Sequence, residues 1–158
     1  DNAVHIGDGP EGLFDLAIRV SEEGLQVPRE LTAIARSVAP DVTKVTLPRV
    51  RSSLERVLVA PHIGAGLQWL HDAGVLAIVL PEIDATVDFS QEAGRRHKDV
   101  WEHTKQVIRQ CSGDRVVRWS ALLHDIGKVP TRKILPDGRV TFHRHAEVGA
   151  RMFDSIQK

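Results

Sequence analysis

The chain has 158 residues, of which 42% are hydrophobic and 4% aromatic, and its 21 basic residues balance its 21 acidic residues. This length and apolar content suffice for one domain or two small helical lobes, and the zero net charge neither favours nor excludes a nucleic-acid partner. One cysteine, Cys111, leaves no disulfide partner and is typical of a reducing cytoplasm, and the longest apolar run, residues 74–80, is too short to cross a membrane.

Glycines and prolines divide the first half of the chain into short amphipathic helices. Apolar residues at helical spacing predict a first helix that ends at Gly24 and a second that runs between Pro28 and Pro40. Thr46 is predicted to cap a third helix with its hydroxyl group. A fourth helix should end at Gly74. This half of the chain is therefore expected to be a helical lobe.

The second half continues the helical pattern and carries most of the chemistry. A helix is expected over residues 97–111, with His103 on its apolar stripe, and another after Asp114. His124 follows Val117 by seven residues, so it is expected to face inward near the end of that second helix. The only strand signal is a short hairpin near residues 133–141, around a Pro-Asp-Gly turn. We therefore expect an all-α fold.

Three histidines and one aspartate occur in an order that suits a metal ion. His103 is followed on the next helix by the pair His124 and Asp125, and His145 lies further along the chain. Imidazole and carboxylate groups bind divalent ions such as Mn, Ni, Fe, Zn or Mg. A lone histidine on an apolar face is more often structural, so the prediction depends on the whole group. His145 is either a ligand or a neighbour of the ligands.

This order resembles the HD superfamily of metal-dependent phosphohydrolases. A narrower resemblance covers roughly residues 10–155: residues 122–128 (Leu-Leu-His-Asp-Ile-Gly-Lys), together with residues 67–82, 99–104 and 142–149, are similar to the HD domain and adjoining helices of bacterial tRNA nucleotidyltransferases, the CCA-adding and poly(A) polymerase family. The resemblance implies a helical neck-and-body-like, RNA-binding segment over residues 1–88. It implies the first helices of an HD domain, incomplete at the C-terminal end, over residues 89–158.

The resemblance also implies an activity and the residues that carry it. An HD domain would hydrolyse phosphate esters of nucleotides or RNA, with a divalent ion as its cofactor. Asp125 would orient the attacking water as well as bind the ion, and Lys128 would assist catalysis at the phosphate. Substrate contacts would come from His97, Lys128 and Arg132, because cations beside a metal cleft suit a phosphate group. The expected partners are a nucleotide or RNA phosphate and tRNA, in the cytoplasm.

Two alternatives bear on this assignment. The chain is also consistent with a non-catalytic, tRNA-binding neck, body and HD portion of such an enzyme, because these residues contain no nucleotidyltransferase head. Arg49 and Arg56, seven residues apart on one helix, would then contact RNA phosphates, although solvated surface charge is the commoner cause of such spacing. HD enzymes usually add a distant downstream Asp, and Asp154 is too close to His145 to match well. A signalling hydrolase of the HD-GYP kind is disfavoured, because the chain has no tyrosine.

Overall fold

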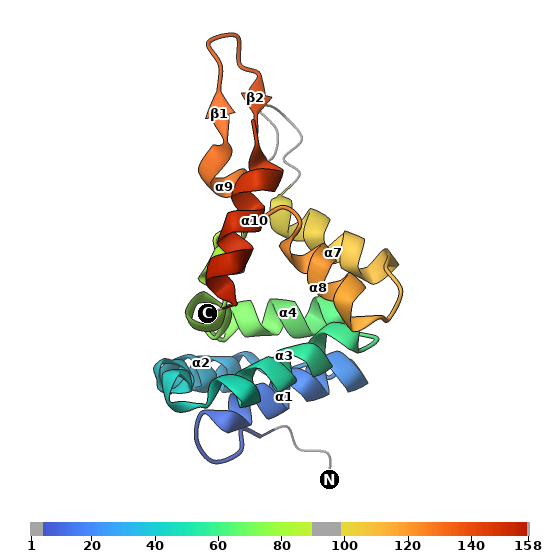
Figure 1. The fold of residues 1–158 in the computed structure, drawn as a ribbon. Helices are drawn as coiled ribbons and strands as arrows, with labels where there is room; N and C mark the ends of the chain where they lie inside the picture. The colour runs from blue at the N-terminus through green and yellow to red at the C-terminus, as the bar shows by residue number, and fades with distance from the viewer. Residues whose placement is uncertain (1–4, 90–98, 158) are drawn as a thin grey trace. The chain divides into compact units, whose positions relative to one another are not determined.

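The computed structural model (Figure 1) describes residues 5–89 and 99–157 of the chain. They form two compact units: one comprises Asp1–Pro81 with Gly113–Arg115, and the other comprises Glu82–Ser112 with Val116–Lys158. The regular secondary structure of the described residues is helical apart from one two-stranded hairpin, so the all-α prediction is confirmed. None of the described helices is both long enough and apolar enough to span a membrane.

The first unit is a set of short helices separated at the predicted positions. Gly24 ends the first helix and Gly74 ends the turn after the fourth, each with a left-handed backbone (φ 69° and 76°) that favours glycine. Thr46 precedes the third helix as expected, but its hydroxyl group makes no capping hydrogen bond, so that detail of the prediction is wrong. The elements are α1 (Glu11–Glu23), α2 (Arg29–Val38), a 3-10 helix (Ala39–Lys44), α3 (Leu47–Val59), α4 (Ile63–Asp72) and α5 (Leu76–Val79).

The core of the first unit forms where α1 packs against α3 and α4. Leu13, Phe14 and Leu70 are among its fully buried side chains. Two ion pairs also join α1 to α3: Arg49 lies 2.7 Å from Asp15, and Arg56 lies 2.8 Å from Glu22. Both pairs link residues that are 34 apart in the sequence, so the two helices run in the same direction with a constant register.

Gly66 provides a direct test of this packing. A Cβ atom at Gly66 would lie 2.7 Å from both Cβ and Oγ of Ser21, whose hydroxyl group donates a buried hydrogen bond to the carbonyl oxygen of Val57. We expect Gly66→Ala to lower the free energy of unfolding by about 1–3 kcal/mol, as overpacking does. Gly113→Ala is the control, because no atom lies within 4 Å of its Cβ position. Equal denaturant midpoints for the two variants would contradict this account.

The second unit carries the predicted histidine motifs. Its first long helix begins at Val100 because Asp99 caps it, accepting a 2.8 Å hydrogen bond from the backbone N–H of Trp101. The hairpin is antiparallel, as predicted, with Lys133 opposite Thr141, and Figure 1 shows it extending away from the helices that flank it. The elements are α6 (Pro81–Asp84), α7 (Val100–Gln110), α8 (Arg115–Leu123), α9 (Lys128–Thr131), β1 (Lys133–Ile134), β2 (Val140–Thr141) and α10 (His145–Ile156).

One premise of the sequence analysis is wrong. Val117 is 41% exposed, so its position on α8 does not define a buried face of that helix. In addition, α8 ends at Leu123, and His124 lies in the turn that follows. The orientation of His124 therefore comes from this turn and not from helical spacing.

Candidate metal centre

The turn between α8 and α9, residues 124–127, presents the central carboxylate of the site. Leu123 and Ile126 are buried on either side and hold the turn against the core. Asp125 lies between them and is only 4% exposed. A buried carboxylate is costly unless charged or hydrogen-bonding groups surround it. The groups around Asp125 therefore decide what this turn can do.

Three histidines approach Asp125 through the same ring nitrogen. Nε2 of His124 lies 3.1 Å from Oδ2 of Asp125, and Nε2 of His103 lies 3.8 Å from the same oxygen. Nε2 of His145 lies 3.9 Å from the other carboxylate oxygen, Oδ1. The possible donor atoms of His103, His124 and Asp125 all lie within 4.8 Å of one another, a grouping that could hold a metal ion. The structure therefore brings all four sequence-predicted ligands together.

Hydrogen bonds to the backbone fix two of the imidazole rings. Nδ1 of His124 lies 2.6 Å from the carbonyl oxygen of Ala121, and Nδ1 of His145 lies 3.1 Å from that of Phe142. A carbonyl oxygen only accepts, so Nδ1 must carry the proton in both rings. In a neutral ring, the lone pair then lies on Nε2, the atom that faces Asp125. This arrangement is common in histidine ligands, whose second nitrogen donates to a carbonyl or carboxylate group.

The electrostatics of the turn favour a charged carboxylate. Burial alone would raise the pKa of Asp125, but hydrogen bonds from the His124 ring, when both of its nitrogens are protonated, and from Lys128, together with their charges, outweigh it and lower that pKa to about 2. The hydrogen bond to Asp125 raises the pKa of His124, against the effect of its own burial. An ionised carboxylate is the form that binds a cation.

A close backbone contact sets the position of His145. A Cβ atom at Gly127 would lie 1.9 Å from the carbonyl oxygen of His145 and 2.7 Å from the backbone nitrogen of Gly149. Only glycine allows the turn to approach the start of α10 this closely. The contact therefore places His145 beside Asp125. In the sequence, 19 residues lie between the two, and they include α9 and the hairpin.

Of the three residues predicted to bind substrate, the structure describes Lys128 and Arg132, and they have different surroundings. Nζ of Lys128 lies 2.9 Å from Oδ2 of Asp125 and also 5.6 Å from the ring centre of Phe142. The guanidinium group of Arg132 lies over the ring of Phe89, 4.1 Å from its centre. His97 lies outside the described residues. Lys128 is thus part of the site, whereas Arg132 lies over an aromatic ring.

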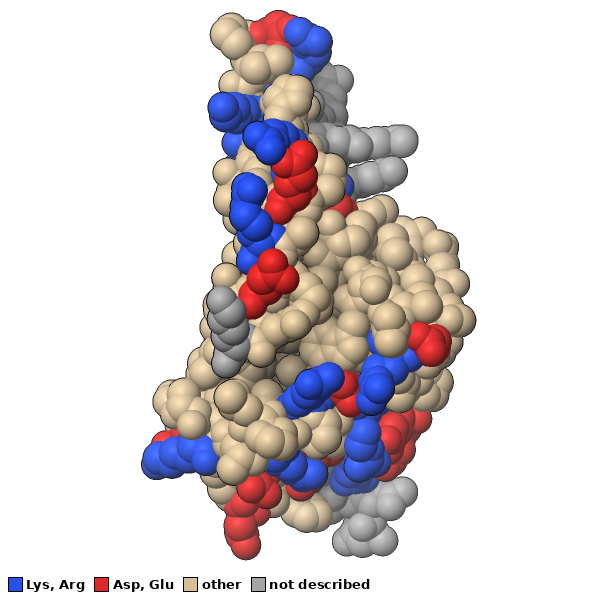
Figure 2. Space-filling model, in the orientation of Figure 1, with Lys and Arg blue, Asp and Glu red and all other residues tan. Residues whose placement is uncertain are grey.

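Arg49 and Arg56, predicted to contact RNA, are the two arginines that pair with Asp15 and Glu22 on α1. A paired guanidinium group has less charge available for a phosphate. Figure 2 shows basic and acidic side chains interspersed on the face it draws, in keeping with the zero net charge. RNA contact by these two residues remains a prediction.

Comparison with known protein families accounts for both parts of the chain. Residues 98–158 match the family model of the HD domain, so the metal-capable group lies within an HD domain. Residues 24–86 match the model described as the probable RNA and SrmB-binding site of polymerase A. The chain therefore carries an HD domain next to a helical segment of this RNA-binding type, and its curated homologues are bacterial tRNA nucleotidyltransferases.

The curated relatives support this assignment and are longer than the chain. The A-adding tRNA nucleotidyltransferase of Deinococcus radiodurans is 36% identical over 132 residues, covering 77% of this chain and 30% of that protein. The CC-adding tRNA nucleotidyltransferase of Thermus thermophilus is 37% identical over 110 residues, covering 66% and 25%. The multifunctional CCA protein of Ectopseudomonas mendocina is 32% identical over 149 residues, covering 90% and 35%. The chain thus spans about a third or less of these relatives, and no solved structure matches it.

Proposed function

We propose that this chain contains a divalent-metal site that hydrolyses phosphate esters of nucleotides or RNA. The observation that carries the proposal is the convergence of Nε2 atoms on Asp125, with His124 and His145 each held by a backbone carbonyl at Nδ1. Rings fixed in this way present lone pairs to a shared point beside a buried carboxylate. A structural cluster of histidines has no such requirement.

The donor set fits a divalent ion of the first transition row or magnesium. Two imidazole groups and a carboxylate suit Mn, Ni, Fe or Zn more than Ca, which prefers oxygen ligands alone. His103, His124 and Asp125 would hold the ion, with His145 as a fourth ligand or a neighbour. When bound, the ion would supply a water of lowered pKa and a positive charge for the phosphate oxygens.

The side chains of the chain would do the remaining work. Asp125 would use one carboxylate oxygen to accept a hydrogen bond from the attacking water and so orient it. Lys128, whose Nζ lies 2.9 Å from that carboxylate, is close enough to turn towards a phosphate oxygen and neutralise it. Arg132 would contact the substrate further out, and substrate contact by His97 remains a prediction from the sequence.

The test is metal content followed by hydrolysis. We expect the purified chain to bind divalent metal and His124→Ala to lose most of it, measured by elemental analysis after dialysis. His143→Ala is the matched control, because His143 is an exposed histidine of the same unit outside the metal-capable group. Equal metal content in wild type, His124→Ala and His143→Ala would refute the site. Release of phosphate from nucleotide monoesters, or opening of cyclic diesters to monoesters, by the loaded chain would then establish the reaction.

A second function is the non-catalytic alternative, in which this portion helps a longer tRNA nucleotidyltransferase to hold tRNA. Two observations favour it: the match of residues 24–86 to an RNA-binding family, and relatives that are named for tRNA and extend well beyond the chain. Metal binding without hydrolysis of any phosphate ester, combined with tRNA binding by the chain, would support this alternative over the hydrolase.

A further inference from the structure

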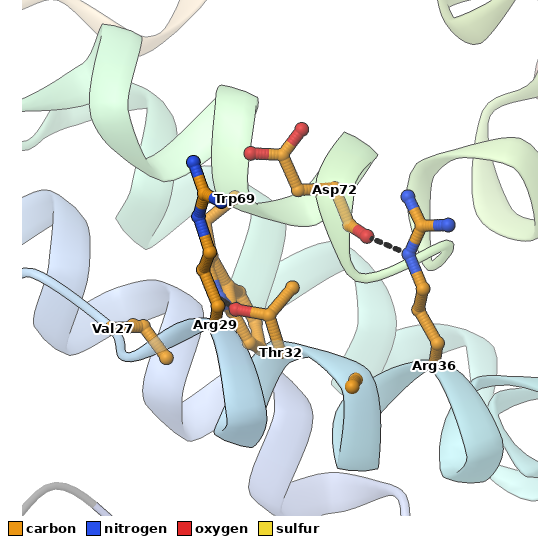
Figure 3. Close-up of a pocket in the computed structure, with 7 residues that line it drawn as sticks. Val27, Arg29, Thr32, Arg36, Trp69 and Asp72 are labelled. Atoms are coloured by element: carbon orange, nitrogen blue, oxygen red, sulfur yellow. Dashed lines mark hydrogen bonds between the residues drawn. The ribbon is translucent and has the colours of Figure 1, made fainter.

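A hollow of about 470 Å³ lies on the first unit between α2 and α4 (Figure 3). Its volume is within the range of small-molecule and nucleotide sites. Figure 3 shows Arg29, Thr32 and Arg36 extending from α2 towards α4, which contributes Trp69 and Asp72. The hollow lies in the first unit, whereas the metal-capable group lies in the second unit, and the two share no residue.

The two arginines of this hollow differ from every other arginine of the first unit. Arg29 has no acceptor among the described residues, and Arg36 donates only to a backbone carbonyl oxygen, that of Asp72. Neither guanidinium group therefore forms an ion pair with a described carboxylate group. The other arginines of the unit each pair with a carboxylate: Arg19 with Glu23, Arg49 with Asp15, Arg51 and Arg115 with Glu55, and Arg56 with Glu22.

The hollow is also organised before any ligand binds. Nε of Arg36 is tied to the end of α4, so the guanidinium plane is oriented while its two terminal nitrogens have no acceptor among the described residues. The indole N–H of Trp69 donates to the hydroxyl group of Thr32 (3.3 Å), which fixes the wall between the two arginines. Arg29 and Arg36 are seven residues apart, about 10 Å along one face of the helix. Flexible side chains can close that distance onto phosphates of the same strand.

The remaining polar group is a carboxylate, which a site for phosphate alone would not include. Asp72 lines the hollow beside the two arginines and accepts a 3.0 Å hydrogen bond from the side chain of Gln68. Its oxygens can accept a further hydrogen bond. In a nucleotide, the donor nearest to a phosphate is the ribose hydroxyl, and carboxylate groups recognise ribose hydroxyls in other nucleotide sites.

We propose that this hollow binds the sugar–phosphate backbone of a single RNA strand. Arg29 and Arg36 contact phosphates, because the guanidinium group matches phosphate oxygens in charge and geometry. Asp72 accepts a hydrogen bond from a ribose 2′-hydroxyl group, which distinguishes RNA from DNA. An acidic protein segment fits less well, because its carboxylate groups offer no hydrogen-bond donor to Asp72, whereas a ribose hydroxyl group does. The inference rests on the second function proposed above, RNA binding by residues 24–86, and assigns that contact to a pair of residues other than Arg49 and Arg56. It is independent of the metal.

Binding of a fluorescent RNA of about 12 nucleotides to the full 158-residue chain, with a chelator present, tests the arginines. We expect Arg29→Gln and Arg36→Gln each to weaken binding about five-fold and to reduce the slope of log affinity against log salt by about 0.7. Arg51→Gln is the control, because Arg51 is exposed and paired with Glu55, and it should change affinity less than two-fold. Arg29→Lys should retain the salt slope of wild type.

The carboxylate is tested with a DNA of the same sequence. Wild type should prefer RNA, and Asp72→Asn should strengthen DNA binding and so reduce that preference. An unchanged ratio in Asp72→Asn would overturn the role of Asp72. Equal RNA affinities for Arg29→Gln, Arg36→Gln and Arg51→Gln, an absence of RNA binding, or binding of an acidic polypeptide in place of RNA would overturn the whole proposal. Circular dichroism of each variant excludes misfolding as the cause. None of these outcomes depends on the metal site, so the two proposals fail separately.

Discussion

Replacing Gly127 with alanine is expected to destabilise the second unit severely and to abolish metal binding. The new methyl group would have to occupy a position 1.9 Å from the carbonyl oxygen of His145, and backbone atoms cannot yield as a flexible side chain does. Relieving the clash moves α10 away from the turn, at a cost of about 3 kcal/mol or more. Chemical denaturation gives the loss of stability, and elemental analysis gives the loss of metal.

The opposite side of the same contact supplies the control. A Cβ atom at Gly149 would lie 3.4 Å from the backbone nitrogen of Gly127 and 3.8 Å from Ile126, a tight to ordinary separation that a small shift accommodates. Alanine also favours the helix in which Gly149 lies. We therefore expect Gly149→Ala to retain both stability and metal. If Gly127→Ala and Gly149→Ala behave alike, the close approach does not determine where His145 lies.

The second large effect concerns the ion pair between Asp125 and Lys128. A substitution can remove either the negative charge of Asp125 or the positive charge of Lys128. Asp125→Asn should weaken divalent-metal binding at least about 100-fold, because the site loses the one anionic ligand that it has among the described residues, while Lys128 keeps its positive charge. Lys128→Met should do the reverse and bind metal more tightly, because the ammonium group 2.9 Å from the carboxylate competes with the ion. Isothermal titration calorimetry with Mn²⁺ or Ni²⁺ measures the metal dissociation constants of both variants.

Hydrolysis should not follow metal affinity in these two variants. If Lys128 contacts the phosphate, Lys128→Met should bind metal well and still lose activity on nucleotide esters. A Lys128→Met variant with wild-type activity would show that Lys128 is only a partner of Asp125. Weaker metal binding in both variants would show that the ion does not take the place of the ammonium group beside Asp125.

The helices, and the four residues that the fold brings together around Asp125, could be predicted because their signals are local. Gly24 and Gly74 end helices by backbone conformation alone, and apolar spacing identifies the faces that pack. The four residues of the cluster were recognised by their types and order. The hairpin at residues 133–141 was likewise visible from its turn residues.

The remaining features depend on contacts between distant residues. The orientation of His124 comes from the turn after Leu123 and from the carbonyl oxygen of Ala121, and backbone acceptors leave no trace in a sequence. Likewise, the sequence gives Arg29 and Arg56 equal weight as basic residues. Only the fold shows that Glu22 neutralises Arg56 and that no described carboxylate neutralises Arg29.

The parallel register of α1 and α3 determines where the first unit can tolerate a change in chain length. Asp15 and Glu22 are seven residues apart, as are Arg49 and Arg56, so both ion pairs form on matching turns of the two helices. One residue inserted between the two acids rotates one of them by about 100° and separates it from its arginine. One residue inserted in the connection after Gly24, before Pro28, changes neither helix. Length variation in this unit should therefore fall in the connection and not within α1 or α3.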